Sequence, residues 1–169
     1  RDSAVQDAVI CSPCLPGESI DSGTHGTHVA GIAAGTGAGD NTGTPHIGVA
    51  PKANLVNVLA CCDGDISHII KGIEWTIANQ TQVTPHIRVM TSSLGEQQVE
   101  FHIDNDGSSA WSQAVDAAVE SGLVVTLSAG NEFGSATVAG CNTIDSPGDS
   151  RLPITCLLYT SPSPRDIGE

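Results

Sequence analysis

Short apolar runs alternate along the chain with segments whose apolar residues recur at helical spacing. The run Leu55–Leu59 is nearly continuous, which predicts a strand covered on both faces of a sheet. The apolar runs Ile87–Met90 and Val124–Leu127 predict two further strands, the latter buried. The segments Ile66–Asn79 and Ser109–Ser121 carry apolar residues every three or four positions and predict amphipathic helices. Strands and helices in this order predict an α/β fold, with a parallel sheet and helices on both of its faces.

Local signals mark the ends of the two helices. Asp65 precedes the first helix and can accept a hydrogen bond from one of its free N–H groups. Either Ser108 or Ser109 can do the same for the second helix. Gly122 follows the second helix, and glycine commonly stands just past a helix end.

A further helix is predicted over residues 25–36, beginning inside the stretch DSGTHGTHVAGIAAG at Asp21–Gly35. The residues after His28 are small and uncharged, which suits a helix packed tightly on all sides. His25 lies at the start of this helix and is a candidate general base, because imidazole titrates near neutral pH. An isolated histidine is more often an ordinary core or surface residue, so the motif around it has to decide.

The charge balance limits the classes of partner. The 169 residues include 19 acidic and 6 basic ones, for a net charge of −13. This excess of acid disfavours nucleic acid and anionic membrane surfaces as partners. No apolar run reaches the length of a membrane-spanning helix. Aromatic residues make up only 3% of the chain, so the core must consist of aliphatic side chains.

The cysteines leave more than one interpretation open. Cys11 and Cys14 form a CxxC pair, which could be redox-active or half of a zinc site. No second CxxC follows, and the adjacent Cys61 and Cys62 lack the spacing of a zinc knuckle. Structural disulfides or free buried thiols are therefore favoured over a metal site.

Two of the predicted strands are followed by residues suited to a binding cleft. In open parallel sheets, ligands bind beyond the carboxyl ends of the strands. Ser93-Leu94-Gly95 follows one strand, and Ala129-Gly130-Asn131-Glu132 follows the next. The Asn131 amide could donate to a developing oxyanion, as acyl transfer requires, although Asn is also an ordinary turn residue.

These motifs together resemble those of the subtilisin-like serine proteases, the subtilases. HGTHVAGIAAG is similar to the family's histidine signature, and GVAPKANLVNVL to its GVAP segment and the strand after it. VMTSSLG is similar to the strand that pairs with substrate, and SAGNE to the oxyanion segment. The resemblance extends through Thr143–Thr155, so residues 21–155 are expected to be the central part of a subtilisin-like catalytic domain.

The resemblance implies a role for each site residue. His25 corresponds to the catalytic base and Asn131 to the donor that stabilises the oxyanion. The implied substrate-binding residues are Ser93, Leu94, Gly95, Ala129, Gly130 and Glu132. Catalysis would require no metal or other cofactor. The implied partners are polypeptide substrates, with a propeptide inhibitor as a further candidate, and the implied location is secreted or extracellular.

The chain departs from the family at the other two members of the Asp-His-Ser triad. The family's Asp ends a strand in an Asp-Ser/Thr-Gly motif upstream of the histidine. Asp7 lacks that motif, and Asp21 lies so close to His25 that it is expected to shape the loop. The family's nucleophile lies in a GTSMA(x)P motif, which is absent, and Ser161 has none of its context. Of the triad the sequence predicts the histidine alone, and this chain is expected to be inactive as a protease.

The chain is expected to be incomplete at both ends. Residues 1–20 are expected to be a loop that includes a short strand near Ala4–Ile10. Residues 156–169 are expected to be a non-native tail, because CLLYTSPSPRDIGE resembles translated linker sequence and breaks the family pattern abruptly.

Three functions remain open at this stage. The favoured one is a fragment of a serine endopeptidase. The missing Asp and Ser support a second, an inactive protease-like binding module, and the CxxC pair supports a third, a Cys/His metal-binding module. A structural calcium could be held by Asp40 with Asn41, or by Asp104 with Asp106. A solvated acidic loop is the simpler interpretation of both pairs.

Overall fold

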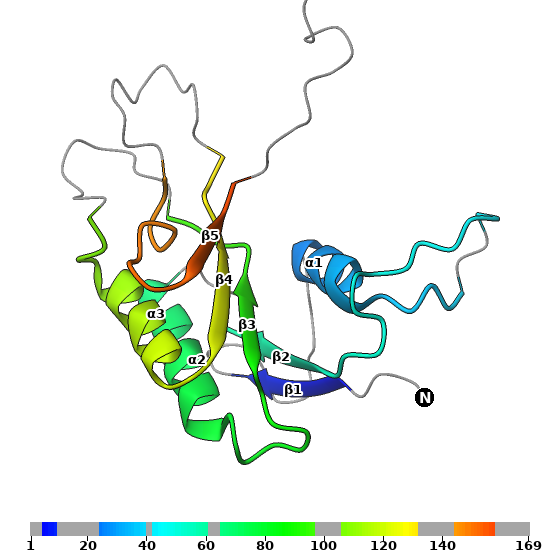
Figure 1. Cartoon of the computed structure of the whole chain (residues 1–169), viewed down its shortest axis with the longest axis horizontal. Coiled ribbons are helices and arrows are strands. Elements are labelled where there is room, and N and C mark those ends of the chain that lie inside the picture. The colour runs from blue at the N-terminus through cyan, green and yellow to red at the C-terminus, as the bar shows by residue number, and fades with distance from the viewer. Residues whose placement is uncertain are drawn as a thin grey trace, which may run out of the picture. The chain divides into compact units, whose positions relative to one another are not determined.

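The computed structural model describes residues 5–9, 24–39, 42–60, 65–96, 106–131 and 144–157. The chain divides into two compact units, Arg1–Ile87 and Arg88–Glu169. Along the chain (Figure 1) the elements are β1 (Val5–Val9), α1 (His25–Ala34), β2 (Leu55–Leu59), α2 (Ile66–Asn79), β3 (Val89–Ser92), α3 (Ala110–Glu120), β4 (Val124–Ser128) and β5 (Ile154–Cys156). Every pair that these strands form is parallel, which confirms the predicted α/β class.

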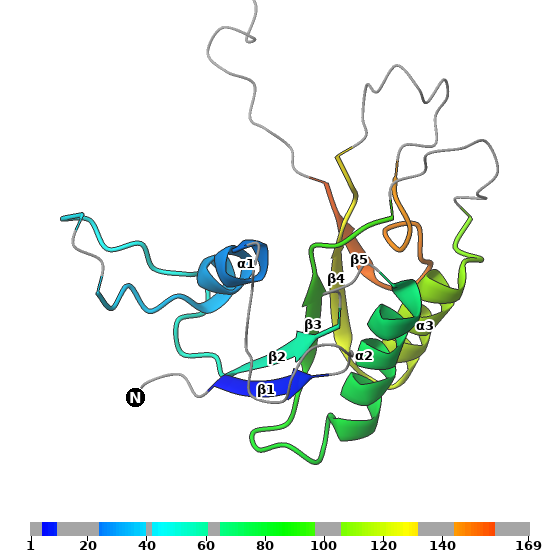
Figure 2. The same cartoon turned by 180° about the vertical axis from the view of Figure 1, so that it is seen from behind.

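In the first unit, β1 and β2 form a parallel pair (Figure 2), in register along the full length of both strands. Strand β1 lies within the predicted range Ala4–Ile10, so the expected strand near the start of the chain is confirmed. Helix α1 lies between the two strands in the sequence, and α2 follows β2 and packs against it.

Helix α2 begins and ends at the predicted residues. Asp65 caps its start, as expected, because the Asp65 Oδ1 atom accepts a hydrogen bond of 2.8 Å from the Ser67 backbone N–H. The pKa of Asp65 is lowered because hydrogen bonds from the Ser67 side chain and then from its backbone N–H favour the charged carboxylate. Ile73 and Thr76 are among its buried residues, and the Thr76 hydroxyl donates to the Gly72 carbonyl at 2.8 Å.

The contact between α2 and β2 depends on a glycine. A Cβ atom placed on Gly72 would lie 2.7 Å from the Cβ of Ala60 and 3.2 Å from the Cγ1 of Val58. Only glycine therefore allows the helix backbone to approach the strand this closely.

Helix α1 is more exposed than its small residues predict. It spans His25–Ala34 rather than residues 25–36, and Ala34 is its one buried residue. Ile32 is 57% exposed. The expectation of a helix packed on all sides is therefore wrong. Small side chains permit close packing, but they offer little apolar area and so do not enforce burial.

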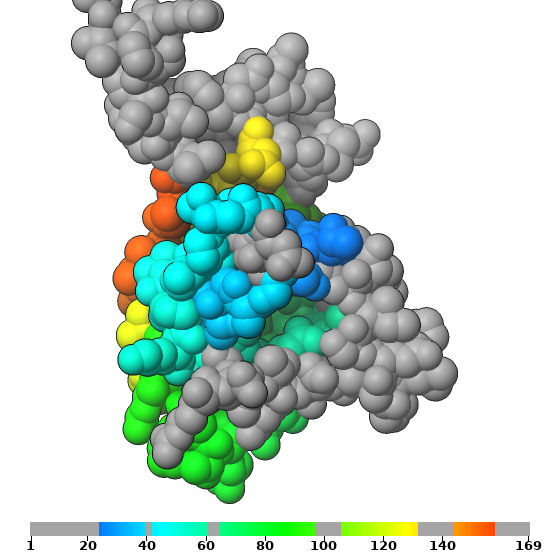
Figure 3. Space-filling model, turned by 90° about the vertical axis from the view of Figure 1, so that its right-hand side faces the viewer, coloured from blue at the N-terminus to red at the C-terminus, as the bar shows by residue number. Residues whose placement is uncertain are grey.

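The connection that follows α1 lies on the surface. Figure 3 shows it in cyan on the face toward the viewer, and Val49 in this connection is 90% exposed. Its backbone is nevertheless fixed to the end of the helix. The Gly48 N–H donates to the Gly35 carbonyl, and the Ala50 N–H donates to the Ala33 carbonyl, both at 2.8 Å.

In the second unit, β4 lies between β3 and β5 in a parallel sheet (Figure 1). Helix α3 packs against β4, and the predicted apolar face of α3 includes Trp111, which is 3% exposed, and Val115, which is 1% exposed. On β4, Val125 and Leu127 are 1% and 2% exposed. Full burial of an aliphatic side chain stabilises the fold by about 1.5–3 kcal/mol, so this layer contains the main core of the unit.

The prediction of a strand covered on both faces is wrong for β2. In β2, Asn57 is exposed and the other residues are half-buried. A strand is covered on both faces only where other elements pack on both of them. An apolar run in the sequence does not determine whether such elements are present.

Strand β3 begins at Val89 rather than at the predicted Ile87 and runs through Ser92. The Ile87 N–H donates to the Gln80 carbonyl at 2.9 Å, which keeps Ile87 in the connection after α2. The predicted parallel pairing of β3 with β4 is confirmed. Strands β2 and β3 belong to different units, so their predicted adjacency stays a prediction.

Ser109, one of the two predicted residues, caps α3. Its Oγ atom accepts a hydrogen bond of 3.0 Å from the Ser112 N–H, and such caps contribute about 1 kcal/mol. The helix ends at Glu120, and Gly122 then adopts a φ of 100°, which confirms the predicted stop.

The structure adds a strand, β5, that the sequence pattern does not predict. It pairs with the end of β4, and the Ala129 N–H extends the pairing with a 3.0 Å hydrogen bond to the Cys156 carbonyl. Cys156, an exposed free thiol, is the first residue of the expected tail. Residues 158–169 lie outside the described residues, so the nature of the tail stays a prediction.

We expect Gly72→Ala to lower the free energy of unfolding, because the added methyl group overlaps Ala60. Overpacking of this kind costs about 1–3 kcal/mol, more than the roughly 1 kcal/mol that alanine gains over glycine in a helix. Gly31→Ala in α1 is the matched control. A Cβ at Gly31 would meet nothing within 4 Å, so this variant should be stabilised. Urea unfolding of both variants measures the difference, and equal effects would contradict the close packing.

Candidate functional site

The two predicted substrate-binding segments meet at one edge of the sheet in the second unit. Residues 93–95 follow β3, and residues 129–131 follow β4. The strands are parallel neighbours, and Ser92 lies opposite Leu127. Both segments therefore leave the carboxyl edge of the sheet, which is the edge where open parallel sheets bind ligands. The structure thus brings residues 93–95 close to residues 129–131, although the two segments lie far apart in the sequence.

A turn at residues 145–149, which we call the clip, contacts both segments. The Asp145 N–H donates to the Ala129 carbonyl at 3.1 Å. The Ser146 carbonyl accepts a hydrogen bond of 2.8 Å from the Glu96 N–H, in an isolated antiparallel bridge. Asp145 is 6% exposed and Ser146 is 1% exposed. The clip thus connects Glu96, which follows residues 93–95, with Ala129, the first of residues 129–131.

Gly130 has a conformation and surroundings that a side chain would disturb. Its φ is 97°, a value that L residues rarely adopt. A Cβ on Gly130 would overlap the Asp145 carboxylate, with its Cγ atom at 2.6 Å. A Cβ on Gly95 would also meet this residue, at 3.2 Å from the Cβ of Asp145. The Asp145 side chain therefore fills the space beside both glycines.

Buried hydroxyl groups anchor the clip to the start of α3. The Ser146 Oγ lies 2.7 Å from the Ser109 Oγ and 3.1 Å from the Ser112 Oγ. The Ser112 hydroxyl donates to Asp149 Oδ1 at 2.7 Å, and Ser112 is 0% exposed. The second carboxylate oxygen of Asp149 accepts a 3.2 Å hydrogen bond from the Gly107 N–H. Each buried polar group in this cluster therefore has a partner, as stable interiors require.

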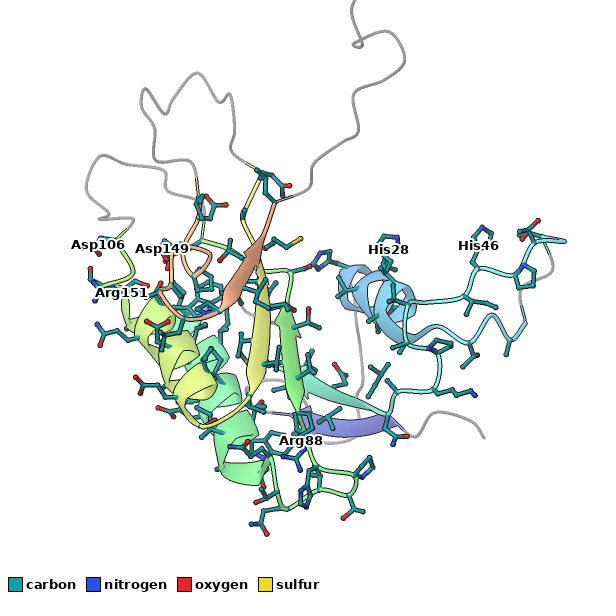
Figure 4. The ribbon with its side chains drawn as sticks, viewed as in Figure 1. His28, His46, Arg88, Asp106, Asp149 and Arg151 are labelled. Carbon is teal, nitrogen blue, oxygen red and sulfur yellow. The ribbon has the colours of Figure 1, made fainter. Side chains whose placement is uncertain are left out.

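Two charged residues, Asp106 and Arg151, lie near Asp149 of this cluster (Figure 4). The Arg151 guanidinium donates to the Asp106 carbonyl at 3.2 Å. The Asp106 carboxylate accepts a hydrogen bond of 2.9 Å from the Ser108 N–H. Hydrogen bonds from the Ser108 side chain and then from this N–H lower the pKa of Asp106. Within the described ranges, no group of three or more His, Cys, Asp or Glu side chains could hold a metal ion. The calcium expectation for Asp104 with Asp106 remains untested, because Asp104 lies outside those ranges.

His25, the candidate base, is the first residue of α1 in the first unit. It is exposed, as is His28 one turn later, which Figure 4 labels. Thr24 precedes it with a φ of 61°, a strained value for a β-branched residue, and no side-chain hydrogen bond caps the helix. His25 and Asn131 belong to different units, so their predicted convergence on one cleft stays a prediction.

Several predicted residues lie outside the described ranges, and their roles stay predictions. They are Cys11, Cys14, Asp21, Asp40, Asn41, Cys61, Cys62, Asp104, Glu132 and Ser161. The clip was missed in the sequence because DSPGD is an ordinary turn composition. The one signal that could have found it is the resemblance of Thr143–Thr155 to the segment after the family's oxyanion residue.

The chain matches a family model described as the Subtilase family over residues 15–164. It is 40% identical over 122 residues to Subtilisin E of Bacillus subtilis (strain 168), covering 70% of this chain and 27% of that protein. It is 41% identical over 138 residues to Subtilisin DY of Bacillus licheniformis, covering 79% and 43% respectively. The chain thus spans less than half the length of these curated relatives.

Solved structures support the same relationship. The structure titled "S41 Psychrophilic Protease" aligns with a TM-score of 0.64 and 25% identity, covering 90% of this chain and 51% of that one. "Sphericase" aligns with a TM-score of 0.62 and 24% identity, covering 92% and 53%, and shows the fold alone. In the described part of the chain, no helix is both long and apolar enough to cross a membrane.

We expect Gly130→Ala to destabilise the second unit strongly. The new methyl group would combine an unfavourable positive φ with an overlap at Asp145. Gly122→Ala is the matched control, because its φ of 100° is similar and a Cβ there would meet nothing within 4 Å. The φ penalty alone is about 1–2 kcal/mol. Urea unfolding should show a larger loss for Gly130→Ala than for Gly122→Ala, and equal losses would mean that Asp145 does not occupy this space.

Proposed function

The chain belongs to the subtilase family, and from this premise we propose that it is the central part of a serine endopeptidase, which hydrolyses peptide bonds. The proposal concerns the intact protein, because the chain spans less than half of its curated relatives. The observation that carries it is the position of residues 93–95 and 129–131 at the carboxyl ends of neighbouring parallel strands.

Each of these segments offers chemistry that peptide hydrolysis requires. The backbone beyond β3, where Gly95 is exposed, can pair with an extended peptide as an added strand. Asn131 is also exposed, and its side-chain amide can donate to the oxyanion of a tetrahedral intermediate. The substrate class on this proposal is a polypeptide in extended conformation.

His25 is the proposed general base. In such a mechanism, imidazole takes the proton of a serine hydroxyl and later gives it to the leaving amine. The exposed position of His25 at the start of α1 leaves the ring accessible for this role. The sequence carries no motif for the serine or for the orienting aspartate, so on this proposal both come from other parts of the intact protein.

A second candidate, an inactive protease-like binding module, is supported by the same lack of motifs for the serine and the aspartate. Such a module would bind peptides at the sheet edge without cleaving them. The third candidate, a Cys/His metal-binding module, would depend on Cys11 and Cys14, which lie outside the described residues. Secretion, a propeptide inhibitor and a structural calcium belong to the endopeptidase proposal as further expectations.

We expect the purified 169-residue chain to remain unlabelled by a fluorophosphonate probe. A base and an oxyanion donor without a nucleophile give no covalent route. The protein encoded by the full-length coding sequence should be labelled at one serine, identified by mass spectrometry of the labelled peptide. Labelling of the shorter chain at any serine would contradict the incomplete triad, and an unlabelled full-length protein would favour the binding module.

In the full-length protein, His25→Ala should abolish probe labelling. Asn131→Ala should lower kcat about 10²–10³-fold with little change in KM, a magnitude established for one such donor on a subtilisin, which is a relative of this chain. His28→Ala, in the same helix, is the matched control and should retain activity. An unchanged kcat in Asn131→Ala would remove this residue from the mechanism.

Glu132 follows Asn131, and we propose that its carboxylate favours substrates with Lys or Arg before the scissile bond. An exposed ion pair contributes about 0.2–1 kcal/mol, so the preference should be severalfold and should weaken with added salt. The measurement compares cleavage of matched Lys and Met peptides by the full-length protein and its Glu132→Gln variant. An equal Lys-to-Met ratio in both proteins at low salt would exclude Glu132 from specificity.

A further inference from the structure

The clip is fixed to the second unit more firmly than a surface turn requires. Its backbone bonds to Ala129 on one side and to Glu96 on the other, at 3.1 and 2.8 Å. The Thr155 hydroxyl of β5 donates to the Gly148 carbonyl at 2.6 Å. A Cβ on Gly148 would lie 2.7 Å from the Ser128 carbonyl oxygen, so the turn also packs directly on the end of β4.

The anchor of the clip is a buried hydroxyl cluster that no substrate can reach. Ser146 and Ser112 are 1% and 0% exposed. Ser146 hydrogen-bonds through its side chain to α3, and through its carbonyl to the residue after Gly95. One residue therefore connects the first turn of a helix to the proposed substrate-pairing segment.

We propose that Ser146 is a positioning residue for peptide hydrolysis, a role that rests on the function proposed above. Its hydroxyl, held by Ser109 and Ser112, fixes the clip. The clip in turn sets the spacing between residues 93–95, which would pair with the peptide, and residues 129–131, which would supply the oxyanion donor. Misplacement of a catalytic group by about 1 Å can cost 10²-fold in rate, so this spacing controls the chemistry without touching the substrate.

A serine that only adds stability would behave differently. Its loss would weaken every part of the second unit to a similar degree. A positioning serine affects first the two hydrogen bonds that the clip makes to Ala129 and Glu96. Amide hydrogen exchange resolves this difference, because it reports local opening at each N–H separately.

The first experiment uses amide exchange by NMR on the 169-residue chain with Ser146→Ala. We expect the Glu96 and Asp145 amides to exchange about tenfold faster or more. The Val124 amide, which begins β4 and donates at 3.0 Å to the carbonyl of Arg88 just before β3, should keep its rate. Ser121→Ala is the control, because it removes a hydroxyl that donates to the Ala118 carbonyl at the other end of α3. It should leave the Glu96 and Asp145 amides unchanged.

Ser112→Ala serves as a second variant should Ser146→Ala fail to fold, since it removes the same anchor from the helix side. Unchanged exchange at the Glu96 and Asp145 amides would overturn the proposal. Equal acceleration at the Glu96, Asp145 and Val124 amides would also overturn it. This experiment requires no enzymatic activity, so its outcome is separate from that of the fluorophosphonate test.

The second experiment measures kinetics in the full-length protein with Ser146→Ala. We expect kcat to fall about tenfold for an extended peptide and for a short ester, because both use the oxyanion donor. KM should rise severalfold for the peptide alone, because only the peptide pairs with residues 93–95. Equal KM values for the variant and the wild type on the extended peptide would overturn the proposed role. If the full-length protein binds peptides without cleaving them, the Kd of the extended peptide replaces KM. Equal Kd values for the variant and the wild type would then overturn the proposed role.

Discussion

Parallel hydrogen bonding between β3 and β4 is the interaction on which the candidate site depends. Neighbouring parallel strands end at the same edge of a sheet, so the segments that follow them must emerge together. This places residues 93–95 beside residues 129–131, although α3 and its flanking loops separate them in the chain. A register shift of one residue would reverse which side chains face the core, and the burial of Val125 and Leu127 opposes such a shift.

The site also depends on buried polar groups whose hydrogen bonds are satisfied. Ser112, Ser146 and Asp149 join the start of α3 to the clip, and leaving one such group unpaired costs about 1–3 kcal/mol. These bonds are directional, so they define a position more sharply than apolar contacts of similar strength. The clip therefore joins this structural cluster at the start of α3 to the two candidate substrate-binding segments, residues 93–95 and 129–131.

The chain belongs to the subtilase family, and on the proposed function its residues limit what it can contribute to peptide hydrolysis. A general base and an oxyanion donor act on a nucleophile, and neither can replace it. His25 and Asn131 also lie in different units of the chain. On the proposed function, cleavage would require both units together with a serine and an aspartate, whereas peptide binding would involve the sheet edge of the second unit.

The sequence by itself determined the elements whose signals are local. The bounds of α2, the Ser109 cap and the stop at Gly122 follow from periodicity and from side chains that bond to their own helix. The strand ends that carry residues 93–95 and 129–131 follow from apolar runs and a family resemblance. The α/β class follows from the order of these elements.

Only the tertiary structure decided burial and the contacts of the clip. The exposure of α1, the late start of β3 and the addition of β5 depend on which elements pack against or pair with them. Asp145 and Ser146 have an ordinary turn sequence, and their importance lies in bonds to Ala129 and Glu96. A local pattern records the preferences of adjacent residues, whereas these bonds join residues that only the folded chain brings within 3 Å or so of one another.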